Sequence, residues 1–355
     1  MEKIKQFLKR KNIEISAKRY GVDALGAMAQ GLFASLLIGT IVGTLGTQLS
    51  IEAFVTVGNF AKETHVVGAA MACAIGWALQ CPPLVLFSLI TVGAATNELG
   101  GAGGPFAVLI ITVIAAELGK AVSKETKIDI LVTPFVTIFS GSMLAVLFAP
   151  VIGSAASSLG NVIIWATDLQ PFVMGILISV LVGIALTLPI SSAAICAALG
   201  LTGLAGGAAV AGCSAQMIGF AVMSFKENGV SGLISQGIGT SMLQMPNIVR
   251  NPRIWIPPTL ASAITGPIAT CIFKLQMNGA PVSSGMGTCG LVGQIGVYTG
   301  WIAPTNQASA ITPSIANWIG LILISFVLPA ILSVVFCTVL RKIGWIKEND
   351  LKLDN

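Results

Sequence analysis

The sequence predicts an all-α integral membrane protein with about 8–10 membrane segments, several of them broken. Of its 355 residues, 55% are hydrophobic and only 9% are charged, whereas a soluble domain carries roughly 25% charged residues. The apolar residues form helix-length blocks and not the ~10-residue alternating strands of an outer-membrane barrel. Forty glycines would let neighbouring helices approach closely.

The start of the chain is basic. The lysines and arginines before position 20 are Lys3, Lys5, Lys9, Arg10, Lys11, Lys18 and Arg19. The apolar block that follows is too long for the core of a cleavable signal peptide. The segment either anchors the chain by the positive-inside rule or lies on the inner leaflet as a basic amphipathic helix. Either role places residues 1–22 in the cytoplasm, with residues 23–340 as the transmembrane domain and 341–355 as a cytoplasmic tail.

Three of the apolar blocks are irregular. The blocks lie at about 24–46, 66–96, 105–119, 130–152, 171–190, 191–222, 254–273, 283–302 and 317–340. Pro82 and Pro83 interrupt 66–96, because proline removes a backbone donor and clashes with the preceding turn. The stretch LGLTGLAGG breaks 191–222, and 283–302 is rich in glycine. Broken helices of this kind are typical of transport sites, although no repeat is found between the two halves.

Loop charges favour one topology. If 66–96 forms two short arms, the glycine-rich loop 97–104 lies outside and the lysines of 120–129 lie inside. Residues 275–316 then enter and leave the membrane from outside, and both termini are cytoplasmic. Counting 66–96 as one span would place these lysines outside.

Few side chains could carry catalytic chemistry. The seven cysteines are scattered at apolar positions without a CxxC pair, so we interpret them as small apolar side chains. His65 is the one histidine in the sequence, which argues against a histidine metal site and against a Ser–His–Asp set. We therefore expect no catalytic residue, no metal and no cofactor.

Ionisable and amide side chains near the apolar blocks are candidate site residues. Asn97 and Glu98 precede a glycine run that would let a ligand approach backbone N–H groups, although Glu98 could equally be a loop acid. His65 either begins a helix at the surface or contacts a substrate. Glu117 is an intramembrane acid, which is functional by default, or an ion-pair partner of Lys120 at i+3.

Two glutamines lie within apolar blocks. Gln294 in GLVGQIGVY and Gln216 in GCSAQMIGF would be unsatisfied if they faced lipid. Each must face protein or a cavity, as a structural hydrogen-bond partner or as a ligand contact. We include Gln294 among the candidate substrate-binding residues.

The stretch PNIVRNPRIWIPP, residues 246–258, concentrates prolines and amides before an apolar run. One interpretation is a cytoplasmic entry into a helix. The other is an extended segment whose freed backbone and amides, those of Asn247 and Asn251, meet a polar ligand. Arg250 and Arg253 suit the cytoplasmic side of the membrane.

This stretch has the spacing N-P-x-x-x-I-P after PNIVR. It resembles the P-I-V-x-N-P-x-x-x-I-P motif of lactose/cellobiose-type enzyme IIC carriers of the bacterial phosphotransferase system. Along nearly the whole chain, DALGAMAQGLFASLLIGTIVGTLG, KETKIDILVTPF and GMGTCGLVGQIG are similar to a divergent IIC-like family labelled toxin regulators of the PfoR type.

The resemblance implies a homodimeric carrier in the bacterial cytoplasmic membrane, with a scaffold, a mobile transport domain and re-entrant hairpins. In that family a sugar moves inward and is phosphorylated by a phosphocysteine on a IIB partner. Asn251, Pro252 and Pro257 match its substrate-contacting region. The characterised carriers have a glutamate followed by proline shortly upstream, where this chain has GIGTSMLQMPN with no acid. Coupling to phosphorylation is therefore left open.

Three functions remain. The main hypothesis is a IIC-type permease for a small polar solute, a sugar or sugar derivative, working with separate IIB and IIA proteins. The others are a carrier uncoupled from phosphorylation and a membrane sensor of the same fold. The amides favour a neutral or weakly anionic solute. The expected partners are this solute, membrane lipid and a second copy of the chain, without nucleic acid.

Overall fold

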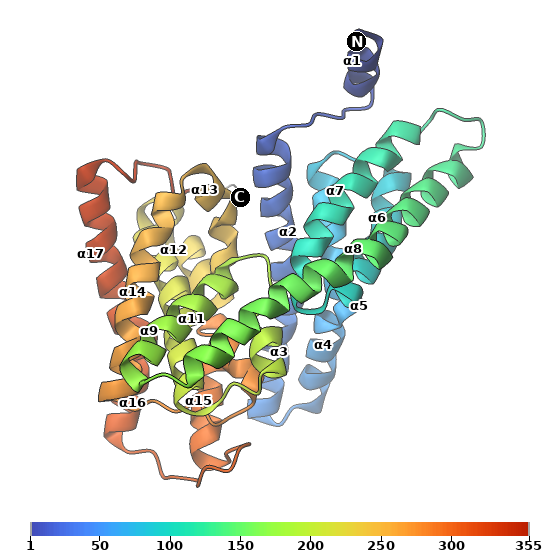
Figure 1. Ribbon diagram of the computed structural model, residues 1–355. Coiled ribbons are helices and arrows are strands. Elements are labelled where there is room, and N and C mark those ends of the chain that lie inside the picture. The colour runs from blue at the N-terminus through green and yellow to red at the C-terminus, as the bar shows by residue number, and fades with distance from the viewer. Residues whose placement is uncertain (1, 354–355) are drawn as a thin grey trace. The chain divides into compact units, whose positions relative to one another are not determined.

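The computed structural model describes residues 2–353, with side chains from residue 5 onward (Figure 1). It is 81% helical, and its described residues contain no strand, only an isolated bridge between Gly203 and Met277. This confirms the predicted all-α membrane fold. The chain divides into two compact units, Met1–Ala156 (unit 1) and Ser157–Asn355 (unit 2).

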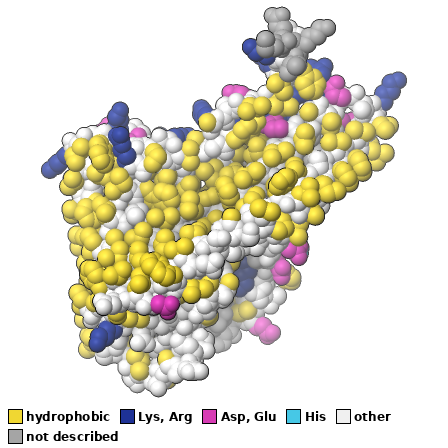
Figure 2. All heavy atoms as spheres, viewed as in Figure 1, with side chains coloured by type: hydrophobic (Ala, Val, Ile, Leu, Met, Phe, Trp, Pro, Cys, Tyr) yellow, Lys and Arg dark blue, Asp and Glu magenta, His cyan; other side chains and the backbone are white. Residues whose placement is uncertain are grey.

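Long apolar helices dominate the structure. Those long and apolar enough to cross a membrane are, among the described residues, Arg19–Leu49, Pro83–Val122, Asp129–Thr167, Gly203–Met223 and Ile315–Ile343. Thr64–Ala78 and Pro171–Thr187 are shorter apolar helices. Figure 2 shows apolar side chains over much of the visible face, with few charged side chains, mostly toward its margins. Such a surface suits lipid rather than water.

Unit 1 consists of helices joined by short turns. Its elements are α1 (Glu2–Arg10), η1 (Arg19–Asp23), α2 (Ala24–Leu32), η2 (Phe33–Leu37), α3 (Ile38–Leu49), α4 (Glu52–Lys62), α5 (Thr64–Ala78), α6 (Pro83–Gly100), η3 (Gly101–Gly103), α7 (Gly104–Val122) and most of α8 (Asp129–Thr167). Helical dihedrals persist through the junctions from η1 to α3, so this stretch is one continuous helix.

The continuous helix η1–α3 packs along α4 and α5, and glycines make the contact possible. A Cβ added to Gly58 would lie 2.5 Å from the backbone nitrogen of Gly43 and 2.6 Å from the carbonyl oxygen of Gly39. A Cβ on Gly31 would lie 2.6 Å from the carbonyl oxygen of Ala70. Small residues let helix backbones touch in this way, which is a common basis of helix association in membranes.

The break predicted within 66–96 is present. After α5 ends, Gln80 adopts a φ of +54°. Pro83 then lies in the first turn of α6, where a missing N–H is tolerated. α6 and α7 pack against each other through a tight turn in which Gly101 has a φ of +49°. The glycine-rich stretch 97–104 thus joins two apolar arms.

Helix α8 is longer than predicted. The expected block 130–152 continues as one helix to Thr167, 39 residues in all, or about 58 Å at 1.5 Å per residue. Pro134 and Pro150 lie inside it without ending it. The predicted end was wrong because residues 153–167 are less apolar but contain no proline, and hydropathy alone does not end a helix.

Unit 2 begins with the end of α8. Its other elements are α9 (Pro171–Thr187), α10 (Ser192–Ala198), α11 (Gly203–Met223), α12 (Phe225–Ile234), η4 (Ser235–Gly239), η5 (Ser241–Gln244), α13 (Met245–Arg250), η6 (Pro252–Trp255), α14 (Ile256–Pro267), η7 (Ile268–Ile272), η8 (Pro281–Gly285), η9 (Cys289–Leu291), α15 (Val292–Ile302), α16 (Ile315–Ile322), η10 (Leu323–Val327) and α17 (Leu328–Ile343).

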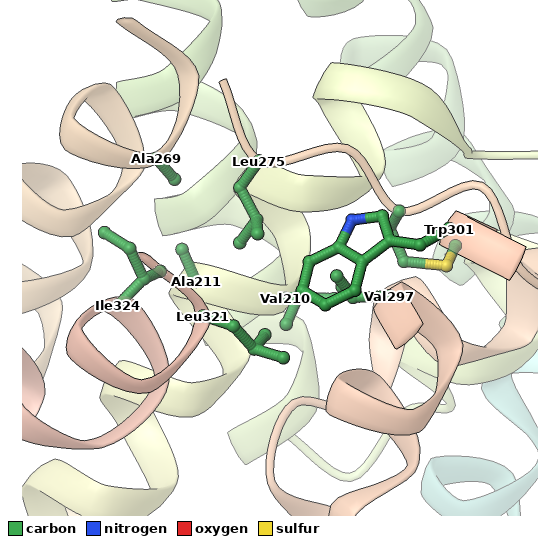
Figure 3. Close-up of a cluster of buried hydrophobic side chains, with 9 residues drawn as sticks. Val210, Ala211, Ala269, Leu275, Val297, Trp301, Leu321 and Ile324 are labelled. Carbon is green, nitrogen blue, oxygen red and sulfur yellow. The ribbon is translucent and has the colours of Figure 1, made fainter. Parts of the chain in front are cut away.

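Helix α11 is the centre of unit 2, because α9, α14 and α17 all pack against it. A Cβ added to Gly212 would lie 1.8 Å from the carbonyl oxygen of Ser179 on α9. A buried apolar cluster ties α11 to later segments of the chain (Figure 3). Its members are Val210, Ala211, Ala269, Leu275, Met277, Val297, Trp301, Leu321 and Ile324.

The break predicted within 191–222 is also present. α10 is separated from α11 by a turn in which Gly200 and Gly203 have φ values of +60° and +66°. Only glycine adopts such values without strain. The turn lets the chain reverse, so that α11 starts again beside α9.

Residues 275–302 form a hairpin against α11. At the start of the first arm, the carbonyl oxygen of Leu275 lies against Gly207 of α11. Farther along this arm, Gly287 packs against Cys213 of α11. This arm therefore advances along α11 toward its middle, and α15 returns beside it. The shape fits the re-entrant segment expected here, while its entry from the outer side stays a prediction.

The stretch 246–258 differs from the extended segment, which was one of the two interpretations of the sequence. Pro246, Pro252 and Pro257 each lie in the first turn of a short helix, namely α13, η6 and α14. Asn251 between them is extended, with φ −141° and ψ 92°. The prediction was wrong for the rest of the stretch, because proline is tolerated at the start of a helix and its φ is already helical.

Candidate functional site

Three of the predicted residues meet in unit 1, where α5 begins and α6 ends. His65 Nε2 lies 2.5 Å from Glu98 Oε2, and both side chains are more than half exposed. Asn97, which is 7% exposed, donates its side-chain amide to the carbonyl oxygen of Thr64 at 2.8 Å. Because α5 and α6 pack side by side, residues 33 positions apart come together. A role in binding solute or moving a proton stays a prediction for this group.

Glu117 lies toward the C-terminal end of α7 in unit 1. Tyr20 donates its hydroxyl to Glu117 Oε1 at 3.0 Å, and Lys120 Nζ lies 2.8 Å from Oε2. Lys120 is 1% exposed and also donates to the carbonyl oxygen of Asn12 at 2.8 Å. The ion pair considered as the alternative to a ligand role is therefore present.

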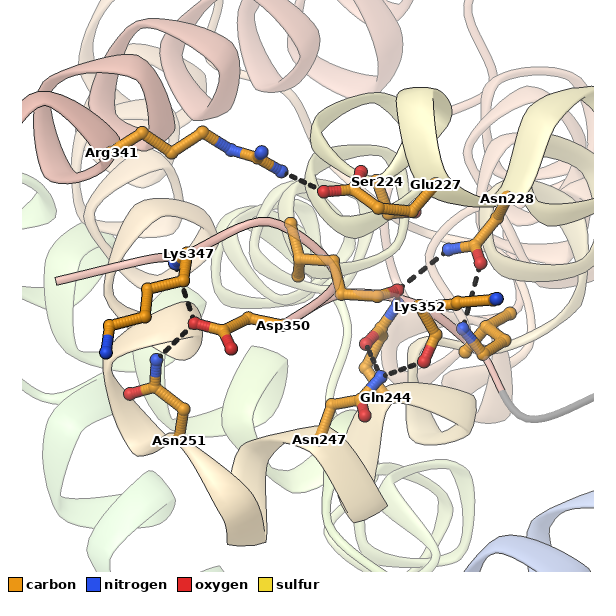
Figure 4. A network of polar contacts seen from close by, with 12 residues as sticks. Ser224, Glu227, Asn228, Gln244, Asn247, Asn251, Arg341, Lys347, Asp350 and Lys352 are labelled. Carbon is orange, nitrogen blue, oxygen red and sulfur yellow. Dashed lines mark hydrogen bonds and ion pairs between the residues drawn. The ribbon is translucent and has the colours of Figure 1, made fainter. Parts of the chain in front are cut away.

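The two asparagines predicted in PNIVRNPR both contact the C-terminal tail in unit 2 (Figure 4). Asn247, which is 3% exposed, donates to the carbonyl oxygen of Lys352 at 2.8 Å. Asn251 donates to the carbonyl oxygen of Trp345 at 3.0 Å and to Asp350 Oδ2 at 2.8 Å. Their amides are engaged by the tail of the same chain, so a contact of either with solute stays a prediction.

Further amides hold the same tail. Asn228 donates to the carbonyl oxygen of Leu351 and accepts from the backbone N–H of Leu353, both at 2.8 Å. Gln244 donates to the carbonyl oxygen of Leu351 at 2.9 Å. We call these amide residues the tail clamp: Asn228, Gln244, Asn247 and Asn251. Sequence analysis missed it, although the alternating leucines of LKL, both buried here, were a signal that the tail packs.

Gln294 lies in the hairpin against α11 and is 8% exposed. Its side-chain nitrogen donates to the hydroxyl of Ser214 at 3.2 Å. Its side-chain oxygen is buried and has no hydrogen-bond partner among the described residues. Leaving a buried acceptor unpaired costs about 1–3 kcal/mol. The oxygen therefore keeps an unused acceptor, and its contact with a solute stays a prediction.

Gln216 on α11 is fully buried in a polar junction. Its side-chain oxygen accepts from the indole N–H of Trp255 at 2.9 Å and from the hydroxyl of Thr187 at 3.3 Å. Its nitrogen donates to Thr259 Oγ1 at 3.2 Å, and Thr187 also pairs with Ser241 at 2.7 Å. Sequence analysis missed the other four residues, although Trp255 stands inside the quoted stretch.

Two similar stretches, PISS after α9 and PVSS at η8, lie against each other in unit 2. Ser192 in the first donates to the carbonyl oxygen of Gly285 at 2.7 Å. Ser284 in the second donates to the carbonyl oxygen of Leu201 at 2.7 Å. The two hydroxyls thus donate to backbone carbonyl oxygens that lie at the end of η8 and between α10 and α11. The similarity of the two stretches was visible in the sequence, but their contact with each other is seen only in the structure.

The polar groups at the Gln216 junction are an amide, hydroxyls and an indole rather than charges. Such groups bind neutral polar molecules by hydrogen bonds. Within residues 5–353, no group of three His, Cys, Asp or Glu side chains is placed to hold a metal ion. These groups suit a neutral polar solute by their chemistry, and binding of such a solute stays a prediction.

Comparison with known proteins identifies the family. The model of the family described as "Phosphotransferase system, EIIC" matches residues 22–353, which is nearly the whole chain. No curated protein and no solved structure matches the chain. The match does not distinguish the PfoR-type subfamily, which stays a prediction. The chain therefore belongs to the EIIC family of the phosphotransferase system.

Proposed function

We propose that the protein is a membrane carrier of a small neutral polar solute, a sugar or sugar derivative. The family supports transport through the phosphotransferase system. The observation that carries the proposal is the buried, unpaired side-chain oxygen of Gln294 beside α11. A solute hydroxyl would satisfy it, and the neutral groups around Gln216 would not repel an uncharged ligand.

Solute would move by alternating access, with unit 2 as the transport domain and unit 1 as the scaffold. One feature of each unit supports this assignment. Unit 2 contains the interrupted helices α10 and η8, and transporters often place their sites at such breaks. In unit 1, the glycine contacts between the continuous helix η1–α3 and α4 form a close interface suited to a rigid support.

The protein would act as a homodimer in the bacterial cytoplasmic membrane, with both termini inside. Contacts within unit 1 support this topology, because Arg10 pairs with Glu125 and Lys120 reaches Asn12. The basic N-terminal segment and the lysine-bearing loop 120–129 thus share one end of unit 1. A monomer by light scattering in mild detergent would contradict the dimer.

Phosphorylation would depend on separate IIB and IIA proteins. The position where characterised carriers have an acid is occupied here by the stretch GIGTSMLQMPN, whose Gln244 is buried against the tail. A neutral amide cannot serve as an acid or base, so a carrier uncoupled from phosphorylation is the second form of the proposal. Uptake measured with and without the partner proteins separates the two forms.

A sensor of the same fold is the alternative, and the tail clamp favours it. A solute that displaced Asn247 or Asn251 from the tail would free a cytoplasmic segment for another protein. In a sensor, solute binding would change the protease sensitivity of the tail without solute accumulation in proteoliposomes.

The experiment for the carrier is uptake of labelled sugars. Proteoliposomes containing the purified chain should accumulate or exchange at least one neutral mono- or disaccharide, competed by the unlabelled sugar. Empty liposomes are the control. Absence of binding and of uptake across a broad panel of neutral sugars would contradict the proposal.

A further inference from the structure

A cavity of about 350 Å³ opens in unit 1 where the N-terminal segment meets the turn between α7 and α8. Its charged lining residues are Arg10, Lys11, Lys120, Lys124 and Glu125. With four cations and one carboxylate, their formal charges sum to +3. Cations gathered in one cavity repel each other unless an anion lies between them.

The one carboxylate is already shared. Glu125 Oε1 accepts from Arg10 Nη2 at 2.7 Å and also pairs with Lys11. The hydrogen bond from Lys11 is the main reason why the pKa of Glu125 lies below its usual range. The geometry therefore converges two donors on one anionic oxygen. Glu117 neutralises Lys120 from outside the lining, so Arg10, Lys11 and Lys124 face Glu125 alone among the lining carboxylates.

The two remaining cations are held in different ways. Lys120 is 1% exposed, and its ammonium is fixed by Glu117 at 2.8 Å and by the carbonyl oxygen of Leu79 at 3.3 Å. Lys124 lies in the turn with a φ of +60°, and its backbone N–H donates to Asp129 at 2.6 Å. In the described part of the chain its ammonium makes no hydrogen bond and no ion pair within 4 Å, and its charge acts on Asp129 only from farther away, so it is available to a ligand.

The position of the cavity indicates the kind of anion. The turn that carries Lys124 connects the apolar stretches Pro83–Val122 and Asp129–Thr167, each able to cross a membrane. The ends of such helices lie at the level of lipid headgroups, where basic pockets bind phosphate groups. Arginine and lysine side chains donate strong, charge-assisted hydrogen bonds to phosphate oxygens.

We propose that this cavity binds a phosphate-bearing anion, supplied by an anionic lipid headgroup or by a free phosphate compound. Arg10, Lys11 and Lys124 contact the phosphate oxygens, and the fixed charge of Lys120 lies behind them. All of its lining residues belong to unit 1, whereas Gln294, which carries the proposed function, belongs to unit 2. It would tie the N-terminal segment to the membrane surface.

The test uses the purified full-length chain with two probes. Native mass spectrometry measures retention of phosphatidylglycerol against phosphatidylcholine, and thermal unfolding in detergent measures protection by inorganic phosphate. We expect preferential retention of phosphatidylglycerol. Retention of phosphatidylglycerol identifies a lipid headgroup as the source. Protection by inorganic phosphate without lipid preference identifies a free phosphate compound.

Two double variants remove equal charge. Arg10→Gln with Lys124→Gln takes two cations from the cavity, whereas Lys9→Gln with Lys127→Gln takes two exposed cations that do not line it. Each cation close to a bound anionic headgroup contributes roughly fivefold to its binding, and Lys9 and Lys127 do not line the cavity. We therefore expect the first variant to weaken binding of the effective probe by roughly 25-fold and the second by less than about twofold.

Two results would overturn the proposal. One is equal weakening in both double variants, which would mean general attraction to charge rather than a site. The other is no preference for phosphatidylglycerol together with no protection by inorganic phosphate. Both double variants keep Lys120, the most buried of the cations, so the fold is expected to persist.

Discussion

Asn251 donates its side-chain amide to the carboxylate of Asp350, 2.8 Å away and 99 residues later in the chain. The same amide donates to the carbonyl oxygen of Trp345, so both of its hydrogens are used. Its oxygen accepts from the backbone N–H of Arg253. A solute can therefore reach this amide only if the tail moves.

Asn251→Ala should weaken solute binding by several-fold if Asn251 is a ligand residue, since a lost hydrogen bond costs about 0.5–1.5 kcal/mol. Arg250→Gln should leave affinity within about twofold, because cytoplasmic charge bias explains that arginine. Calorimetry with the identified solute measures both variants.

A protein that lacks the tail distinguishes a contact of Asn251 with solute from its hydrogen bonds to the tail. If Asn251 contacts solute, Asn251→Ala should still weaken binding after removal of residues 345–355. If the residue only holds the tail, the variant will have no effect in the shortened protein. Wild-type affinity in Asn251→Ala together with loss in Arg250→Gln would reverse the assignment.

Gly58→Ala should destabilise unit 1, because the added Cβ would lie 2.5 Å from the backbone nitrogen of Gly43. Overpacking of this kind costs about 1–3 kcal/mol. Gly43→Ala is the matched control, since its Cβ would lie 3.7 Å from its nearest neighbours. Thermal unfolding in detergent should show a lower midpoint for Gly58→Ala alone, and equal midpoints would contradict the close contact.

Cysteine labelling tests the topology in intact cells. In a cysteine-free background, Ser16→Cys should resist a membrane-impermeant reagent, and Ala102→Cys in the glycine-rich turn should react. The reason is that seven basic residues precede position 20 and favour the cytoplasm. Labelling of Ser16→Cys from outside would refute the topology. Asn355, which would report on the other terminus, lies outside the described residues.

Glu125→Gln should loosen the N-terminal segment, because it removes the carboxylate shared by Arg10 and Lys11. A carboxyl with a lowered pKa contributes stability above its unfolded value and loses it as the pH falls through the lower folded value. Wild-type hydrogen exchange near Lys11, corrected for intrinsic rates, should therefore be equally slow at pH 7 and pH 5.

The same exchange experiment has a matched control. Glu125→Gln should exchange faster near Lys11 at both pH values, whereas Glu63→Gln, at an exposed acid of the same unit, should match wild type. Fast exchange of the wild type at pH 5 would contradict the lowered pKa.

Local chemistry predicted the breaks in the chain but not every helix end. Pro82, Pro83 and Gly200 act within one turn of their own position, so their effect can be inferred from neighbouring residues. The end of α8 was missed because hydropathy falls near residue 152 while helix geometry continues. Of the two interpretations of 246–258, the extended segment was wrong, because Pro246, Pro252 and Pro257 each lie in the first turn of a helix.

The sequence could not predict which residues of the site meet, because the contacts join residues far apart in the chain. The contact of His65 with Glu98 depends on how two helices pack, and that of Asn251 with Asp350 on where the tail lies. His65, Glu98 and Asn251 were predicted candidates and Asp350 was not, and neither pairing was predicted. Gln294 was singled out because a buried amide needs partners, and the structure shows that its oxygen has none among the described residues.

The most direct test of the account is calorimetric titration of Gln294→Ala with a transported neutral sugar. Gln307→Ala is the control, an exposed glutamine in the same unit. We predict binding weakened about twofold to thirteenfold in Gln294→Ala, as for a lost hydrogen bond of about 0.5–1.5 kcal/mol, and unchanged binding in Gln307→Ala. Wild-type affinity in a folded Gln294→Ala protein would contradict a solute site at this residue.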